Sequence, residues 1–262
     1  MEQLKNHIMD SRKIVIKIGS NVLSDKDGVV NKAVIHNIVE QVNSLMEMGK
    51  QVILVSSGAG ICGVGAINKW SRRGDINYKQ ALCAIGQVEL LMAYKEYFGD
   101  YDIHVAQMLL TRDDFDDNHR TLNIRNTMFT LIDEGVVPII NENDSVCVEE
   151  IKIGDNDTLA ALTAILWNAD LMIILSDIDG VFDKDPKACE DAKLIETVES
   201  AEKLIEAGYD VTQSTVSRDI KKLRIVKGHD RDGNYRYIAA EQTAPRSDNH
   251  YRELFAHSVK SV

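Results

Sequence analysis

The sequence predicts an α/β protein built on a mostly parallel β-sheet with helices on both faces. Three observations predict this fold class. Short β-branched runs alternate with longer segments of helical periodicity, the short runs are apolar throughout, and each runs into Gly, Ser, Asn or Asp. Alternation of this kind builds parallel sheets, whose ligands gather at the carboxyl ends of the strands.

The first 180 residues carry these elements in order. Strands are expected at residues 13–19, 51–58, 136–144 and 171–180. A helix is expected over residues 32–50, because apolar residues recur every three or four positions and Gly49 follows as a C-cap. The segments NTMFTLIDEG and DTLAALTAILWNA repeat the helical spacing. The carboxyl ends of the strands should therefore meet at one edge of the sheet.

Composition and cysteine spacing narrow the class of protein. A chain of 262 residues with 44% hydrophobic and 27% charged residues suits one large domain, with or without a small appendage. No apolar run reaches the roughly 20 residues of a membrane span, and the N-terminus is too charged for a signal peptide. Cys62, Cys83, Cys147 and Cys189 stand singly, which argues against a disulfide framework or a cysteine metal site. We expect a cytoplasmic protein without membrane contact and without a protein-held metal.

Small and basic residues follow the first two expected strands. Lys17 is followed by Gly19 and Ser20, so backbone amides and one ammonium group lie side by side. Residues 56–60 read SSGAG and open toward a helix, as an anion cradle does. A single such turn is usually only a tight strand exit, but two at successive strand ends favour a phosphate site.

The third expected strand ends in a further polar cluster. Asn141, Asn143 and Asp144 lie at its carboxyl end, and residues 154–157 form an Asx-rich turn that caps the next helix. Such clusters are most often only turns and caps. Here Lys152 also precedes a helix N-terminus, whose amides and dipole favour an anion.

Residues 11–200 resemble the glutamate 5-kinases of the amino acid kinase family. The resemblance rests on the motifs KIGSNVL, SSGA, LLTRDDFDD, LNIRNT, PIINENDSV, IKIGDNDTLAA and LSDIDGVFDKDP, which occur in order. It implies an open αβα sandwich that phosphorylates the γ-carboxylate of L-glutamate with ATP and Mg²⁺, the first step of proline synthesis.

The resemblance also implies roles for individual residues. Lys17 and Asp155 would be catalytic. The chemistry of phosphoryl transfer adds Lys152, either as a second cation for the moving phosphoryl group or as a solvated ion-pair lysine. The residues implied to bind glutamate are Ser57, Asp144 and Asn156. Those implied to lie by the nucleotide are Lys17, Gly19, Ser20, Ser176 and Asp177, while Asp157 would help Asp155 to order the site. Phosphoryl transfer depends mainly on such positioning and charge neutralisation.

The resemblance ends near residue 200. The family carries a second glycine-rich stretch there, typically Gly-Gly-Met followed by Thr-Lys, whose lysine stabilises the transferred phosphoryl group. After Gly180 this sequence has no two adjacent glycines. We therefore expect the C-terminal part of the kinase fold to be missing, with several closing strands and half of the nucleotide site. Glutamate should then bind more detectably than ATP, and turnover should be slow.

Residues 201–262 resemble part of the winged helix-turn-helix of the arginine repressor family. TQSTVSRDIKKL matches the recognition helix and RIVKGHDRDGNYRYIAA a β-hairpin wing. Gln213, Ser214, Ser217 and Arg218 would face base edges. This segment carries 11 Lys and Arg against 9 Asp and Glu in a chain of net charge −11, which supports DNA binding only weakly. The first helix and the arginine-binding domain of the repressors have no counterpart.

The sequence thus predicts two domains, a truncated kinase at residues 1–200 and a partial DNA-binding segment at residues 201–262. Natural fusion, frameshift, assembly error or design would each produce such a chain. Three classes of function stay open: a glutamate 5-kinase, which accounts for most of the chain, an arginine repressor-like regulator, and a non-functional chimera. The expected partners are L-glutamate, ATP and weakly bound DNA, and a homo-oligomer is expected.

Overall fold

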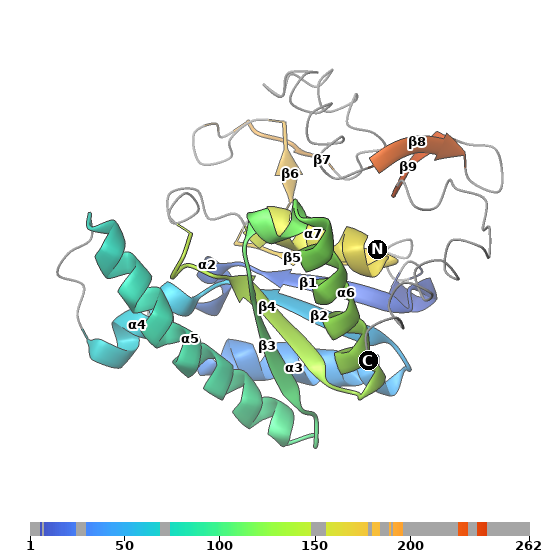
Figure 1. Ribbon diagram of the computed structural model, residues 1–262. Helices are drawn as coiled ribbons and strands as arrows, with labels where there is room; N and C mark the ends of the chain where they lie inside the picture. The colour runs from blue at the N-terminus through green and yellow to red at the C-terminus, as the bar shows by residue number, and fades with distance from the viewer. Residues whose placement is uncertain are drawn as a thin grey trace, which may run out of the picture. The chain divides into compact units, whose positions relative to one another are not determined.

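The computed structural model describes residues 6, 8–24, 30–68, 74–147, 156–177, 180–183, 189, 191–195, 225–229 and 235–239. The chain divides into two compact units, Met1–Gly180 and Val181–Val262. The first unit holds the large sheet and its helices (Figure 1).

A five-stranded parallel sheet forms the centre of the first unit, in the order β3-β4-β2-β1-β5. The strands are β1 (Lys13–Ile18), β2 (Gln51–Ser56), β3 (Val105–Leu110), β4 (Val137–Glu142) and β5 (Leu171–Leu175). The four predicted strands are confirmed, and β3 is an additional one. Among the described residues β5 has β1 as its only strand neighbour. The predicted mostly parallel α/β fold is therefore confirmed.

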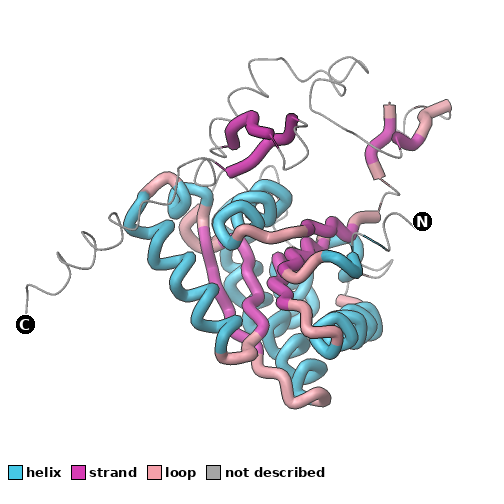
Figure 2. Tube along the Cα trace, turned by 90° about the vertical axis from the view of Figure 1, so that its right-hand side faces the viewer, coloured by secondary structure: helices cyan, strands magenta, loops and turns pink. Residues whose placement is uncertain are grey.

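Helices cover both faces of this sheet (Figures 1 and 2). Helices α3 (Lys32–Glu47) and α5 (Ile76–Gly99) contribute to one hydrophobic cluster, whereas α6 (Asn118–Asp133) and α7 (Asn156–Trp167) contribute to the other. Strand β1 serves both clusters, because Ile14 and Ile16 belong to the first and Val15 to the second. Alternate side chains of a strand point to opposite faces, so the sheet is buried on both sides.

Local signals in the sequence account for the ends of α3. The Asn31 side chain accepts hydrogen bonds from the amides of Ala33 and Val34 at 3.1 and 3.4 Å, as an N-cap does. At the other end Gly49 has φ +78°, and its amide donates to the carbonyl of Met46 at 2.8 Å. The predicted C-cap glycine is therefore confirmed.

Three short helices follow strands β1, β2 and β3 in turn. They are α2 (Ser20–Leu23), α4 (Ala59–Ile67) and the 3₁₀ helix η1 (Arg112–Phe115). The sequence interpretation foresaw a helix after residue 58 but neither its bounds nor the long α5 that follows it.

Helices α4 and α5 pack against each other through glycines. A Cβ atom added to Gly86 of α5 would lie 1.7 Å from the carbonyl oxygen of Ala59, and one added to Gly63 of α4 would lie 1.9 Å from that of Leu82. The two backbones can approach this closely only without side chains at these positions. Residues 59–60 and 82–83 are thereby brought face to face.

The second unit contains two small antiparallel pairs. Strand β6 (Val181–Phe182) pairs with β7 (Leu194–Ile195), and β8 (Ile225–His229) pairs with β9 (Tyr235–Ala239). The second pair lies where the sequence predicts a hairpin wing.

The other features predicted for the C-terminal segment lie outside the described residues. They are the junction near residue 200 and the recognition-helix residues Gln213, Ser214, Ser217 and Arg218. No helix in the described ranges is long and apolar enough to cross a membrane.

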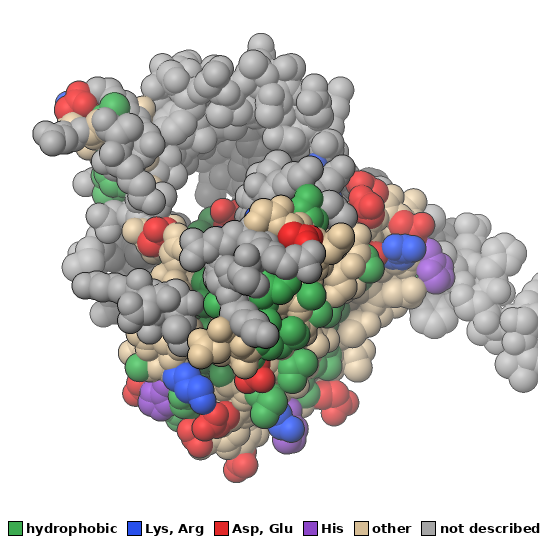
Figure 3. Space-filling model, turned by 90° about the vertical axis from the view of Figure 1, so that its left-hand side faces the viewer, with side chains coloured by type: hydrophobic (Ala, Val, Ile, Leu, Met, Phe, Trp, Pro, Cys, Tyr) green, Lys and Arg blue, Asp and Glu red, His purple; other side chains and the backbone are tan. Residues whose placement is uncertain are grey.

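Hydrophobic side chains are exposed along one side of α5. Ile85, Val88 and Met92 expose 37%, 58% and 60% of their surface at helical spacing. Figure 3 views the molecule from the side on which α4 and α5 lie, and green hydrophobic side chains gather on that face.

Candidate active site

A pocket of about 500 Å³ opens where the carboxyl ends of β1, β2, β4 and β5 meet. Its lining comes from these strand ends and the turns that follow them, together with α2, α4, α5 and the first residue of α7. Strand β1 lies between β2, the next strand in the chain, and β5, the last strand of the sheet. Open α/β sheets bind ligands at this type of position.

The N-terminus of α4 forms one wall of the pocket. Gly58 precedes the helix with φ +103°, a conformation that side chains rarely adopt. Ser57 precedes Gly58, Ala59 and Gly60 follow it, and all three also line the pocket. Free amides at the start of a helix attract anions, so this wall suits a carboxylate or phosphate.

Lys17 provides a cation from within the sheet. Its Nζ lies 2.7 Å from Oδ1 of Asp157, and the side chain of Lys17 is 11% exposed against 58% for Asp157. A Cβ atom added to Gly19 would lie 3.6 Å from Nζ and 3.3 Å from the carbonyl oxygen of Leu175. The missing side chain at residue 19 therefore leaves the ammonium group accessible.

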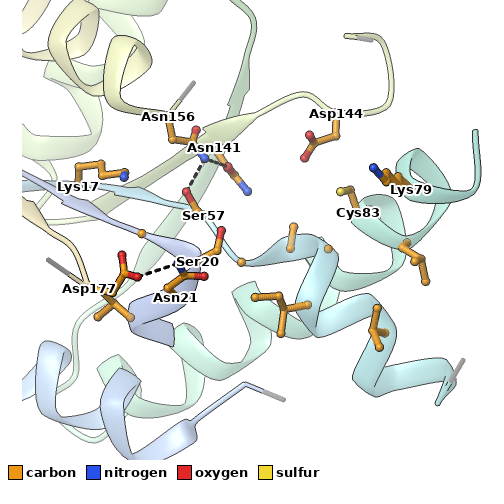
Figure 4. A pocket seen from close by; sticks show the side chains of 18 of the residues that line it. Lys17, Ser20, Asn21, Ser57, Lys79, Cys83, Asn141, Asp144, Asn156 and Asp177 are labelled. Carbon is orange, nitrogen blue, oxygen red and sulfur yellow. Dashed lines mark hydrogen bonds between the residues drawn. The ribbon is translucent and has the colours of Figure 1, made fainter. Parts of the chain in front are cut away.

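Three polar side chains meet at the centre of the pocket (Figure 4). Nδ2 of Asn156 donates hydrogen bonds to Oγ of Ser57 at 2.7 Å and to Oδ1 of Asn141 at 3.0 Å. Oδ1 of Asn156 is buried and has no hydrogen-bond partner among the described residues. A buried acceptor without a donor is costly, so this oxygen is suited to receive a donor from a ligand.

Asp144 lies on the α5 side of the pocket, beside Cys83 and Lys79 (Figure 4). Burial raises the pKa of the Asp144 carboxyl, and a hydrogen bond from the Cys83 thiol offsets part of that effect. The pKa of Cys83 is raised to about 12 by its own burial and by the charge of Asp144. Cys83 is therefore a neutral donor at physiological pH and not a nucleophile.

The turn after β5 closes the side near Lys17. Nδ2 of Asn21 donates a hydrogen bond to Oδ2 of Asp177 at 3.0 Å, and Oγ of Ser176 donates to Oδ1 of the same carboxylate at 3.5 Å. The first of these bonds joins α2 to a residue 156 positions later in the chain.

One pocket thus contains every predicted substrate- and nucleotide-binding residue. These are Lys17, Gly19, Ser20, Ser57, Asp144, Asn156, Ser176 and Asp177. Lys152 and Asp155 lie outside the described residues, so their roles stay predictions.

Several lining residues have no counterpart in the sequence predictions. Tyr78, Lys79, Leu82 and Cys83 belong to the first two turns of α5, and Asn21 belongs to α2. Asn141 lies at a strand end that the sequence predicts, but the sequence predicts no role for it. The only sequence signal for the α5 residues is Asp75, whose side chain caps the helix by accepting from the amide of Tyr78 at 3.2 Å.

The fold is an αβα arrangement with a polar pocket at the carboxyl ends of its strands, whose lining includes a helix N-terminus and the Lys17 ammonium. The sequence model of the amino acid kinase family matches residues 12–232, and the chain belongs to this family. The match continues past residue 200 and so includes part of the segment that resembles the arginine repressor.

Within the family, the chain groups with the glutamate 5-kinases. It is 62% identical over 199 residues to the glutamate 5-kinase of Alkaliphilus metalliredigens, covering 76% of this chain and 75% of that one. It is 57% identical over 228 residues to that of Alkaliphilus oremlandii, covering 85% of this chain and 87% of the other. Among solved structures, UMP kinase from Ureaplasma parvum matches with a TM-score of 0.57 at 18% identity, covering 80% and 86% of the two chains. This last likeness is one of fold.

Proposed function

We propose that the pocket binds L-glutamate and ATP and transfers the terminal phosphoryl group of ATP to the γ-carboxylate, as in the first step of proline biosynthesis. One observation carries the proposal: a single pocket holds an amide cluster around Asn156 at its centre, the Asp144 carboxylate at one end and the Lys17 ammonium at the other. A substrate with an ammonium group and a reactive carboxylate fits between such ends.

The glutamate site is formed by Ser57 and Asn156 at the centre of the pocket and by Asp144 on its α5 side. The carboxylate of Asp144 and the unpartnered Oδ1 of Asn156 accept hydrogen bonds from the substrate ammonium group. Because Nδ2 of Asn156 is committed to Ser57 and Asn141, its amide is held with the oxygen free. This supports binding of the amino acid in one orientation.

The phosphate end is formed by Lys17, Gly19 and Ser20, with Ser176 and Asp177 on the nucleotide side. Lys17 neutralises charge that develops on the transferred phosphoryl group, since its ammonium is held in place by Asp157. Lys152 is proposed as a second cation, with a solvated ion pair as the alternative, and Asp155 as a residue that orders the site.

Mg²⁺ is expected to enter with ATP. No group of three or more His, Cys, Asp or Glu side chains suited to hold a metal ion occurs among the described residues. Mg²⁺ commonly binds through substrate phosphates and water with only one or two carboxylates, so the residues present suit a metal carried by the nucleotide. The metal would neutralise phosphate charge.

Trapping of the acyl phosphate tests the proposed function. The purified chain is incubated with ATP, Mg²⁺, L-glutamate and hydroxylamine, and formation of the γ-hydroxamate is measured. Hydroxamate that depends on both ATP and glutamate supports the proposal, and its absence from a folded protein contradicts it. The slow turnover expected from the missing glycine-rich segment stays a prediction that the same assay measures.

The pH dependence of the kinase is expected to report Asp144. Its pKa is raised by burial. As the pH falls, Asp144 therefore becomes protonated, and stops binding the ammonium group, at a higher pH than an ordinary aspartate would. We expect kcat/KM for glutamate to fall on the acid side with a midpoint above 3.8. The limb in kcat should lie lower, because bound ammonium stabilises the ionised form. Coincident limbs in both profiles would contradict this assignment.

DNA binding is a second candidate, favoured by the antiparallel β8–β9 pair at the residues predicted to form a wing. The amino acid kinase match continues to residue 232, so it overlaps residues 201–232 of the segment that resembles the repressor. A mobility-shift assay on an arginine-operator sequence, compared with Arg218→Ala, tests it. An equal shift on unrelated DNA, or none, removes the candidate.

A homo-oligomer is also proposed, supported by the exposed Ile85, Val88 and Met92 on α5. Sedimentation of the chain and of Val88→Glu measures its size in solution.

A further inference from the structure

Two opposite charges lie on the α5 side of the pocket without an ion-pair partner among the described residues. They are the carboxylate of Asp144 and the ammonium of Lys79, both of which line the pocket (Figure 4). Lys17, in contrast, is already paired with Asp157 at 2.7 Å. Among its described residues the pocket therefore offers one anion and one cation outside any ion pair, both away from the phosphate end.

Lys79 is held in place by the fold. It lies in the first turn of α5, where its amide donates to the carbonyl of Asp75 at 3.0 Å. The close packing at Gly63 and Gly86 fixes this end of α5 against α4. The side chain extends from the helix toward the Asp144 side of the pocket and is partly buried (Figure 4). The position of its ammonium group is therefore more restricted than that of a surface lysine.

The two charges match the head group of an α-amino acid. Such a group carries an ammonium and a carboxylate on the same carbon atom, so it requires an anion and a cation near each other. Asp144 is buried enough that its pKa is raised, which means that the folded chain alone compensates its charge poorly. A bound zwitterion would supply the missing counter-charge to both side chains at once.

We propose that Lys79 binds the α-carboxylate of the amino acid substrate while Asp144 binds its ammonium group. Lys79 then selects a substrate with a carboxylate at both ends over one that carries only the reactive carboxylate. This inference rests on the proposed function, because it assigns the second carboxylate of the same substrate.

The test compares L-glutamate with 4-aminobutyrate, which keeps the reactive carboxylate and the ammonium but lacks the α-carboxylate. Lys79→Met is expected to raise KM for glutamate about 10- to 100-fold, the usual effect of losing a charge-assisted contact. The contact is remote from the reacting atoms, so kcat and the KM for ATP should change little. The affinity for 4-aminobutyrate, measured as substrate or as competitive inhibitor, should stay the same.

Two matched variants accompany the test. Lys79→Arg keeps a cation and should restore most of the preference for glutamate. Lys95→Met removes an exposed lysine from the same helix and should leave every parameter unchanged.

Each outcome is decisive. Equal losses toward both ligands in Lys79→Met would assign Lys79 a structural role and overturn the proposal, as would an unchanged KM for glutamate. A wild-type chain that forms no hydroxamate from glutamate would instead contradict the proposed function itself, before the variants are compared.

Discussion

Lys17→Ala is expected to lower the kcat of the kinase reaction by about 10² to 10³, the usual effect of losing one preorganised charged donor. The Lys17 ammonium is accessible past Gly19 and is fixed by Asp157. No other lysine or arginine among the described residues lines the pocket near this end, since Lys79 belongs to the α5 side. Water that fills the space left by the side chain must reorganise as charge develops, so it replaces the lysine poorly.

The measurement is steady-state hydroxamate formation with both substrates varied. Lys32→Ala is the matched control, because the side chain of that lysine is 68% exposed and its ion pair with Glu96 is long, at 4.0 Å. The fold should tolerate Lys17→Ala, since Asp157 is 58% exposed and stays hydrated without its partner. A variant that keeps more than about a third of the wild-type kcat would show that Lys17 does not act on the transferred group.

Gly86→Ala is expected to destabilise the first unit by about 3 kcal/mol, at the upper end of overpacking costs. The new Cβ atom would lie 1.7 Å from the carbonyl oxygen of Ala59 and 2.3 Å from the amide nitrogen of Gly63. Both contacts are with backbone, so α4 must move away from α5 as a whole. Because residues of both helices line the pocket, the affinity for glutamate should fall as well.

Urea unfolding followed by circular dichroism measures this change. Gly65→Ala supplies the control, because it makes the same substitution in α4 with no heavy atom within 4 Å of the new Cβ. Removing a helical glycine there should leave stability unchanged or raise it by up to about 1 kcal/mol. Equal unfolding midpoints for the Gly86 and Gly65 variants would mean that the two helices are not in close contact.

The parts predicted well from the sequence are those that follow from local pattern. The strands that contain Lys17, precede Ser57 and end before Asp144 are apolar runs with polar exits, and parallel pairing alone brings those exits together. Strand β3 was missed because its six residues, VAQMLL, hold a polar Gln107 and few β-branched side chains. Its place in the sheet is set by pairing with β4 along the whole strand.

The α5 side of the pocket was not predicted, for a different reason. Helix α5 carries apolar residues on its buried face and also on its exposed side, where Ile85, Val88 and Met92 lie, so it has no clear polar face to give a periodic signal. Its position depends on two glycines that look like helix breakers in the sequence. Lys79 and Cys83 reach the site only through this packing.

The length of α5 joins ligand binding to the hydrophobic core. The helix places Lys79 and Cys83 at the pocket and, some fifteen residues later, the fully buried Tyr94 and Phe98 against the sheet. A ligand that binds the first turns favours the docked helix over any state in which it has opened. Amide hydrogen exchange should therefore slow along the whole of α5 when glutamate is present, including at residues that the ligand never touches.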